Sequence, residues 1–429
     1  MMEKLKTLLL TLLVLCSLWL SYLLAYSSSN YDPIPQSDYV QTEPLGSQTE
    51  LEDLLFPDQI VVHMGNQQHS VLYPNNYQYK SILENVKQRS FDGFRKTPIY
   101  VSNINWEDVR DKQQGVEIRF REGLPLSVLQ LLLQIKGELP VDNDIITRIW
   151  IFAKDNQEEV RTFFFTDSPS VGYEVIKADF TVKDIENYIA YGDTVNTFRT
   201  VIGGDYYLPN KPFRVNGYRF AYTQFTAEQL KRSLFVDPGI TRNLKERDGS
   251  EIYTDGKRGL QINNEVHWMN YSDPVAPVES NNDVRDNLVA GVQFVNQHGG
   301  WNGSYMVNRT PSQRTSFTNQ MFVFRQYVDS YPIVNPTLEG FGAIKLSVEK
   351  GIVAGYERSI VLIDLKSMQR REVELPYGDA LDERLKNYPR RGSILSVFPA
   401  YRPVISEKAL DLAPVWALEL RDGTFDFIE

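Results

Sequence analysis

Two histidines lie close enough along the chain to suggest metal chemistry. His63 and His69 stand on either side of Gly65-Asn66, in a chain that has four His and one Cys. A protein-bound metal ion takes three or four ligands from His, Cys, Asp and Glu, and no further donor stands at a fixed spacing from this pair. The sequence therefore predicts two surface histidines, no metal centre and no cofactor.

Two other patterns would suit catalysis. Asp379 and Asp382 are one helical turn apart and could face a cleft together, as the two carboxylates of a glycosidase do, but no substrate-binding context accompanies them. Ser347 and Lys350 fit S-x-x-K, but the K-T-G and S-D-N motifs of acyl-serine enzymes are missing, as are a P-loop and a G-x-S-x-G elbow. Because 55 residues are Asp or Glu, adjacent acids are more often a solvated face. We therefore predict that the chain is not an enzyme and has no catalytic residues.

A third pattern fits contact between membrane helices. Ser17, Ser21 and Ala25 recur every four residues, so they share one face of a helix. Small residues let two membrane helices approach closely, and the Ser hydroxyl groups can hydrogen bond across the gap. The alternative is that a Leu-rich anchor contains small residues in any case. We predict that these three residues contact a transmembrane partner.

The segment that carries this stripe has the length of a membrane span. No charged residue occurs between Lys6 and Asp32, and a helix over residues 7–26 would be about 30 Å long, which matches the hydrocarbon core of a bilayer. Lys4 and Lys6 precede this segment, whereas residues 27–79 contain no Lys or Arg. The positive-inside rule then places residues 1–6 in the cytoplasm and the bulk of the chain outside the cell.

Two alternatives to a retained single-pass anchor concern processing. A cleaved signal peptide has a shorter apolar core and a small-x-small exit. Here Leu23 stands two residues before Ala25, where a cleavage site needs a small residue. Residues 27–29, all Ser, could instead form the small-x-small exit. Lipoprotein processing at Cys16 needs a small residue before it, and Leu15 is not small. We predict a retained signal anchor. Six cytoplasmic residues cannot form a domain, so signals to the cell interior are expected to pass through another membrane protein.

Composition narrows the class of protein further. The 429 residues carry a net charge of −10, and 42% are apolar, which is ordinary for a folded chain and excludes wholesale disorder. An acidic balance disfavours a nucleic-acid binder, whose surface is basic. A single Cys removes any disulfide framework. Aromatic residues make up 12% of the chain and alternate with Val and Ile in short runs, which favours a sheet-rich fold.

The pattern of elements predicts an α+β fold with one transmembrane helix and a multi-domain extracytoplasmic region of antiparallel meanders and packed helices. We expect a cytoplasmic tail (residues 1–6), a transmembrane helix (7–26) and a Pro- and Ser-rich stalk (27–58). An N-terminal unit (59–200), a middle unit (201–282) and a C-terminal unit (283–429) follow. Helices are expected over residues 79–88, 124–135, 181–191, 226–234, 284–297 and 377–387. Asn216-Gly217 predicts a hairpin turn. The last two units share a pattern, a helix and a meander with Gly turns, and this pattern suggests a duplication.

Several motifs in these last units resemble the YycH family of membrane-anchored regulators in Gram-positive bacteria. They are Leu234-Phe235-Val236-Asp237-Pro238, the run from Ile252 to Gln261, Glu339-Gly340-Phe341-Gly342, and the run from Lys350 to Ser359. The resemblance also covers the layout of most of the chain and is loose in the first unit.

This resemblance implies an accessory regulator of an essential two-component system for cell-wall homeostasis. Members of the family work with a related anchored protein, YycI, and contact the sensor histidine kinase WalK, also called YycG, partly through transmembrane helices. The resemblance implies no catalytic residues in this chain, because none are known in the family. The expected partners are thus a WalK-like kinase, a YycI-like protein and the membrane, with no nucleic acid.

Two other functions stay open on the sequence alone. An extracytoplasmic enzyme acting on wall polymers would show clustered carboxylates or a nucleophile in a cleft. A wall- or ligand-binding sensor module would show an aromatic groove, for which Trp268, Trp301 and Trp416 are the candidates, although aromatic residues in a sheet protein are more often core.

Overall fold

The computed structural model describes residues 2–26, 46–99, 104–137, 144–154, 159–201, 206–274, 282–311, 319–337 and 339–429. The chain divides into two compact units, Met1–Gln41 and Thr42–Glu429, and each is described by itself. Residues 27–45 of the predicted stalk and residues 275–281, at the predicted boundary between the middle and C-terminal units, lie outside the described residues.

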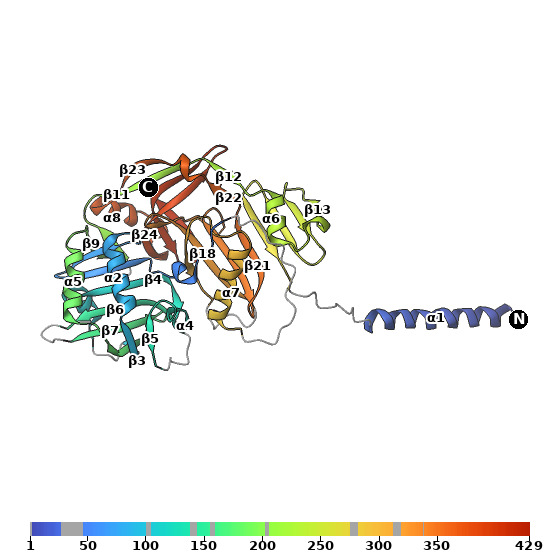
Figure 1. Cartoon of the computed structure of the whole chain (residues 1–429), viewed down its shortest axis with the longest axis horizontal. Helices are drawn as coiled ribbons and strands as arrows, with labels where there is room; N and C mark the ends of the chain where they lie inside the picture. The colour runs from blue at the N-terminus through green and yellow to red at the C-terminus, as the bar shows by residue number, and fades with distance from the viewer. Residues whose placement is uncertain are drawn as a thin grey trace. The chain divides into compact units, whose positions relative to one another are not determined.

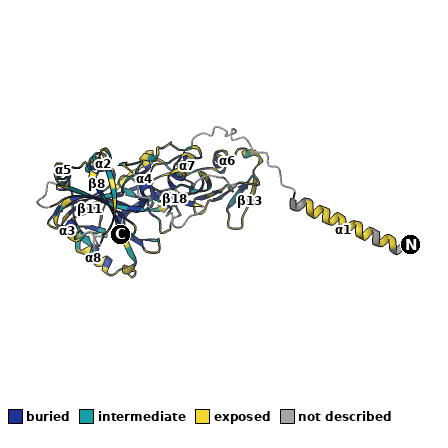
Figure 2. Ribbon diagram, turned by 90° about the horizontal axis from the view of Figure 1, so that it is seen from below, coloured by how far each residue is buried: buried dark blue, intermediate teal, exposed yellow. Residues whose placement is uncertain are grey.

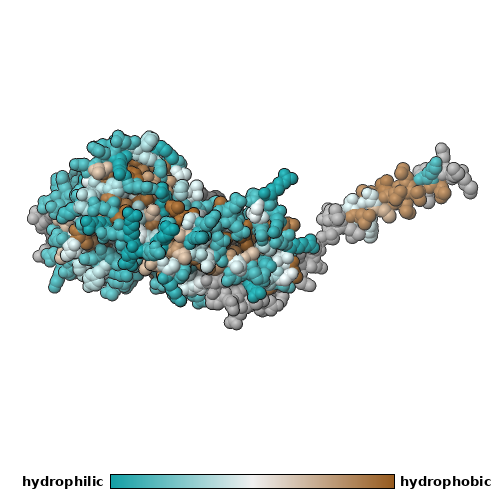
Figure 3. Space-filling view, turned by 90° about the horizontal axis from the view of Figure 1, so that it is seen from above, coloured by the Kyte–Doolittle hydropathy of each residue, from teal (hydrophilic) through white to brown (hydrophobic). Residues whose placement is uncertain are grey.

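The first unit contains one helix, α1 (Met2–Tyr26), which includes the predicted span (Figure 1). Its segment Lys4–Tyr22 has a mean hydropathy of 1.8 and is long and apolar enough to cross a membrane. The described side chains of α1 are exposed, and Figure 3 shows the helix brown along most of its length. An apolar surface of this kind is stable only when another apolar medium covers it.

The second unit begins with residues 46–58, which fall in the predicted stalk. Ser47 and Trp301 exchange two backbone hydrogen bonds of 3.0 and 2.8 Å. The short 3₁₀ helix η1 (Leu51–Leu54) follows, and Leu54 and Leu55 are each 1% exposed. The structure thus places residues 46–58 within the folded unit, while the division of the chain into units otherwise stays a prediction.

The N-terminal half of the second unit is built on a ten-stranded sheet that is antiparallel except where β3 pairs with β5. In order across the sheet its strands are β10 (Tyr206–Pro209), β9 (Thr197–Val201), β2 (Gln68–Leu72), β1 (Gln59–Gly65), β4 (Gln114–Pro125), β6 (Ile145–Ala153), β7 (Val160–Thr166), β8 (Val171–Ala178), β3 (Ser90–Pro98) and β5 (Gln134–Lys136).

Alternation along the strands gives this sheet two apolar faces. Ile149 and Ile151 of β6 join the main core with α2 (Tyr77–Gln88) and α5 (Val182–Gly192), which lie on the same side of the sheet in Figure 1. Trp150, between them, points to the opposite face and packs in a separate aromatic cluster with α3 (Trp106–Lys112). Both faces of the central strands are therefore buried.

The C-terminal half contains a nine-stranded sheet, a five-stranded sheet and a two-stranded ribbon. The nine-stranded sheet consists of β13 (Arg242–Lys245), β14 (Glu251–Thr254), β15 (Gly259–Asn263), β16 (Trp268–Ser272), β21 (Ile352–Ser359), β20 (Ala343–Glu349), β18 (Gln320–Val328) and β17 (Ser304–Arg309), with β19 (Tyr331–Pro332) beside β18. The five-stranded sheet consists of β23 (Gln369–Leu375), β11 (Phe213–Phe220), β25 (Leu410–Leu420) and β24 (Ile394–Ile405), with β26 (Phe425–Ile428) beside β25. The ribbon pairs β12 (Tyr222–Gln224) with β22 (Val361–Ile363).

The described residues of this half form three α-helices: α6 (Ala227–Leu234), α7 (Val284–Gln297) and α8 (Gly378–Lys386). Short 3₁₀ turns occur at Pro238–Ile240, Leu365–Ser367 and Arg391–Ser393. Strands from both sides of residue 282 share the two large sheets, since β16 pairs with β21 and β11 with β25. Figure 2 shows the strands of both halves largely dark blue, which places the cores within the sheets.

The structure confirms the α+β fold and the helices predicted over residues 181–191, 226–234 and 284–297. Helix α7 has the predicted bounds, and Thr181 and Thr226 cap α5 and α6 through capping boxes with Asp184 and Gln229. The Lys350-Gly351 turn between β20 and β21 has φ values of 51° and 81°, as a tight hairpin requires.

Two predicted elements are wrong. The helix expected over residues 124–135 is one turn, α4 (Leu126–Leu129), followed by turns and β5. A short apolar run is buried equally well as a helix or as turns, so periodicity could not separate them. The hairpin expected at Asn216-Gly217 is one continuous strand, β11. Gly217 has no positive φ there; a Cβ would lie 3.1 Å from Pro414 Cδ, so the glycine makes room for β25.

Candidate functional site

The predicted membrane contact lies on α1. Ser17 and Ser21 are exposed and four residues apart, on one face of the helix. Ala25 lies in the same helix, and its side chain is outside the described residues. The contact with a transmembrane partner stays a prediction.

The two neighbouring histidines are buried, and the prediction of surface residues is wrong. His63 on β1 is directly opposite His69 on β2, they are 3% and 1% exposed, and their Nδ1 atoms are 3.0 Å apart. At this distance one Nδ1 carries a hydrogen and donates a hydrogen bond to the other Nδ1. Their burial comes from packing, because the Trp150 ring contacts His63 and the Tyr207 ring contacts both histidines.

A buried ion pair lies beside these histidines. Glu117 on β4 is fully buried, and its Oε2 accepts a hydrogen bond from Arg119 Nη2 at 2.9 Å and lies 3.5 Å from His63 Nε2. Tyr207 on β10 donates its hydroxyl to the same oxygen at 3.3 Å. Asp111 lies 3.8 Å from His69 Nε2 on the other side. We call His63, His69, Glu117, Arg119 and Tyr207 the histidine cluster.

The charges in the histidine cluster are fixed by burial and pairing. Burial by itself would raise the pKa of Glu117, but Arg119, the hydrogen bond with His63 and the charge of Arg148 hold that pKa well below its usual value. Burial lowers the pKa of both histidines, that of His69 to about 3. At neutral pH the cluster therefore holds an ionised Glu117 and Arg119 with two neutral imidazoles.

This arrangement predicts acid sensitivity. The unfolded chain takes up protons on His63 and His69 below about pH 6.5 while the folded chain does not, so stability falls as the pH drops below 6.5. For His69 the fall continues towards pH 3, by up to about 1.4 kcal/mol per pH unit. Chemical unfolding of the wild type and of His69→Gln between pH 5 and 8 measures this. The variant is expected to show the shallower slope. Its matched control, His267→Gln on a partly exposed histidine, is expected to change the slope less.

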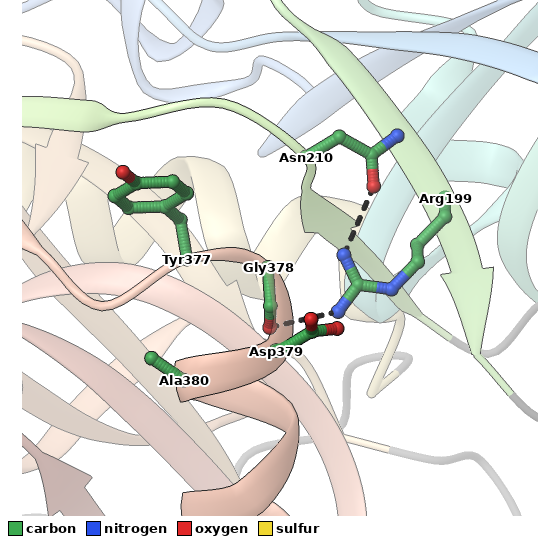
Figure 4. A pocket seen from close by; sticks show the side chains of 6 residues that line it. All are labelled: Arg199, Asn210, Tyr377, Gly378, Asp379 and Ala380. Carbon is green, nitrogen blue, oxygen red and sulfur yellow. Dashed lines mark hydrogen bonds between the residues drawn. The ribbon is translucent and has the colours of Figure 1, made fainter.

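The predicted carboxylate pair lies beside a pocket of about 570 Å³ (Figure 4). Arg199 on β9 points at the first turn of α8, where its Nη2 donates to the Gly378 carbonyl at 3.2 Å and pairs with Asp382 Oδ2 at 2.7 Å; its Nη1 donates to Asn210 Oδ1 at 2.9 Å. Asp379 lines the pocket. Asp382 therefore anchors the arginine that joins the ten-stranded sheet to α8.

The three tryptophans considered for a binding groove are core residues. Trp268, Trp301 and Trp416 are 8%, 1% and 0% exposed, and the last two donate their indole N–H groups to Asn296 Oδ1 at 2.8 Å and the Pro376 carbonyl at 2.9 Å. In the part of the chain that the structure describes, no group of three His, Cys, Asp or Glu residues could hold a metal ion.

Fold and site together define an α+β protein whose N-terminal helix can cross a membrane and whose histidine cluster holds a buried Glu117–Arg119 ion pair. A family model described as the N-terminal domain of YycH protein matches residues 3–194, and one described as its C-terminal domain matches residues 204–428. The chain belongs to the YycH family.

Two comparisons, one of sequence and one of structure, find similarity to YycH of Bacillus subtilis over nearly the whole chain. The two-component system WalR/WalK regulatory protein YycH of Bacillus subtilis (strain 168) is 20% identical over 440 residues, which cover 97% of this chain and 94% of that protein. The crystal structure of YycH from Bacillus subtilis has a TM-score of 0.70 at 18% identity and covers 90% of this chain and 99% of its own. The structural likeness establishes the fold.

Proposed function

We propose that this chain is a non-catalytic accessory regulator of a two-component sensor histidine kinase that controls cell-wall homeostasis. The observation that carries the proposal is the full-length similarity to a WalR/WalK regulatory protein, together with family models that match both halves of the chain. The partners are a WalK-like kinase and a YycI-like anchored protein.

The proposed location is the cell membrane, with a single span and an extracytoplasmic folded unit. Lys4 and Lys6 flank the start of the apolar segment of α1, and no Lys or Arg follows until after residue 79. This asymmetry supports a cytoplasmic N-terminus. The paired state of Asp382 and the burial of the tryptophans support a regulator over a wall-acting enzyme or a wall-binding module.

Helix α1 is the described segment able to lie beside the transmembrane helices of a kinase. We propose that Ser17, Ser21 and Ala25 form the contact. Two Ser hydroxyl groups that each bond across a helix interface contribute together about 1.2 kcal/mol, which is about eightfold in affinity.

The proposal is tested by the double variant Ser17→Leu, Ser21→Leu in the full chain. Membrane insertion is expected to persist because the helix becomes more apolar, while the kinase recovered with the tagged protein from membranes falls about fivefold to tenfold. Leu12→Phe, which adds apolar bulk on the opposite face of α1, is the matched control and is expected to recover the wild-type amount. Equal recovery of kinase with all three proteins would remove the helix-face contact from the proposal.

A further inference from the structure

Strand β13 forms an open edge of the nine-stranded sheet. It is the terminal strand in the order of that sheet, and among the described residues no strand pairs with its outer side. Figure 1 shows it at the outer margin of the lobe that contains α6. Its four residues, Arg242 to Lys245, are all exposed, and the exposed fraction of Leu244 is 57%. An edge strand of this kind presents unpaired N–H and C=O groups with which another chain can pair.

The ladder between β13 and β14 shows which backbone groups face outwards. The turn after β13 is closed by a hydrogen bond of 2.9 Å from the Glu246 N–H to the Ser250 carbonyl, in register with the ladder. Residues of an antiparallel strand direct their N–H and C=O groups alternately towards and away from the partner strand. Leu244, two residues before Glu246, therefore bonds with β14. The backbone groups of Asn243 and Lys245 face outwards.

The edge strands of the five-stranded sheet differ from β13. β24 contains Pro399 and Pro403, which have no N–H to donate, and proline is a common protection of a sheet edge. On β23 the exposed Glu372 and Glu374 both pair with Arg214 of the neighbouring strand, at 3.7 and 3.2 Å. Those charges are balanced within the sheet. β13 has no proline, and both of its charges are positive.

The charges on β13 determine which strand can pair with it. Arg242 and Lys245 stand at its two ends with no acidic residue between them, in a chain whose net charge is −10. Lys245 is 74% exposed and lies 3.9 Å from Glu251 Oε1, which is beyond hydrogen-bonding distance. In an antiparallel pair of two β13 strands, Arg242 of each copy would stand opposite Lys245 of the other, and like charges opposite each other are unfavourable. The edge therefore repels a second copy of itself and favours an acidic strand.

An apolar position lies between these charges. Leu244 is directly opposite Ile252 of β14, so the two side chains share one face of the sheet. On the other face Asn243 Nδ2 donates to the Tyr253 hydroxyl at 3.2 Å, which holds β13 on the sheet. A strand added outside β13 would thus extend an apolar row on one face and find its backbone partners already in place.

We propose that β13 is a docking edge for an extended, acidic segment of a partner protein, which adds to the nine-stranded sheet as a further antiparallel strand. Backbone hydrogen bonds from and to Asn243 and Lys245 hold the segment. Acidic side chains opposite Arg242 and Lys245, and an apolar one opposite Leu244, give the specificity. The docking edge belongs to the folded unit, so its failure would leave the proposed contact of α1 with the kinase standing.

Hydrogen exchange of single amides in the full chain, kept in detergent micelles, tests the docking edge. In the free chain the amides of Asn243 and Lys245 are expected to exchange freely, whereas β14 protects that of Leu244. The probe is the synthetic peptide Thr-Glu-Val-Thr-Glu-Thr, whose central four residues match the register. At about ten times its dissociation constant, the peptide is expected to slow exchange at Asn243 and Lys245 about tenfold and to leave Leu244 unchanged.

Two altered peptides separate strand addition from charge attraction. One has Lys in place of both Glu residues, and it is expected to bind about tenfold more weakly because its charges repel Arg242 and Lys245. The other keeps both Glu residues but is N-methylated at the two positions opposite Asn243 and Lys245, so it cannot donate backbone hydrogen bonds to the edge. It is also expected to lose about tenfold in affinity.

A charge-reversed edge supplies the matching test on the protein. The double variant Arg242→Glu, Lys245→Glu changes two exposed side chains and is expected to bind the Lys peptide in preference to the acidic one. Lys366→Glu, Arg371→Glu, at two exposed residues outside β13, gives the same change in net charge and is expected to bind the acidic peptide as the wild type does.

Four results would overturn the docking edge. The first is an acidic peptide that leaves the Asn243 and Lys245 amides unchanged at millimolar concentration. The second is equal binding of all three peptides, which would indicate attraction without strand addition. The third is a free chain in which these two amides exchange as slowly as that of Leu244, because another part of the chain would then cover the edge. The fourth is protection that grows with protein concentration alone, as a second copy would give.

Discussion

Replacing Glu117 by Gln is expected to lower the free energy of unfolding of the ten-stranded sheet domain by about 3–5 kcal/mol. The substitution keeps the shape of the side chain and removes the charge that compensates Arg119, whose guanidinium lies 4.8 Å from the Tyr207 ring in a buried site. The remaining cation would stay in a medium that solvates it poorly. Chemical unfolding at pH 7.5, followed by tryptophan fluorescence, to which Trp150 beside His63 contributes, measures the loss.

Two further variants distinguish the effect of breaking the buried ion pair from the effect of removing a carboxylate anywhere in the protein. Glu374→Gln, at an exposed carboxylate paired with the exposed Arg214, is expected to change stability by less than about 1 kcal/mol. The double variant Glu117→Gln, Arg119→Met removes both charges and is expected to recover part of the loss, because no uncompensated cation stays buried. A single variant as stable as the wild type would show that the buried pair is not what stabilises this sheet.

The sequence predicted best those elements whose signals are local. Helix α7 begins at an Asp283 cap and ends before glycines with positive φ, and both signals are visible in the chain. The turn at Asn216-Gly217 was predicted by the same local logic and is wrong, because Pro414 of β25, almost two hundred residues away, occupies the space beside Gly217. The conformation at such a position depends on sheet partners that are distant in sequence, and the neighbouring residues carry no signal of those partners.

The histidine cluster shows why sites formed between strands escaped prediction. In β4 the alternation of side chains places Glu117 and Arg119 on the face opposite Val116 and Ile118. Such a pattern usually means one buried and one solvated face. Here both faces are covered, and Tyr207 from β10 joins the charged one. The signal that could have revealed it is the oppositely charged pair two residues apart, in a chain whose two neighbouring histidines flank a Gly-Asn turn.

The largest expected effect on function comes from exchanging the membrane span. Replacing residues 7–26 of the full chain with an unrelated Leu-rich helix of equal length is expected to abolish most of the regulation of the kinase, while the folded unit stays intact and anchored. A regulator shifts its partner only by the difference between its affinities for the two signalling states. Under our proposal the face of α1 that carries Ser17 and Ser21 supplies that difference.

The composition of the segment that joins α1 to the folded unit supports a regulatory role for α1 and a tethering role for the folded unit. Pro33, Pro35 and Pro44 occur within residues 27–45, a composition typical of a linker that tethers without conveying torque. The folded unit would then raise the effective concentration of the span beside its partner, and residues 1–31 alone, when overexpressed, are expected to retain part of the regulation. Kinase activity, read from phosphorylation of the response regulator, compares the wild type, the span-exchanged chain and the isolated segment at matched membrane levels. Full regulation by the span-exchanged chain would move the signal from α1 to the surface of the folded unit.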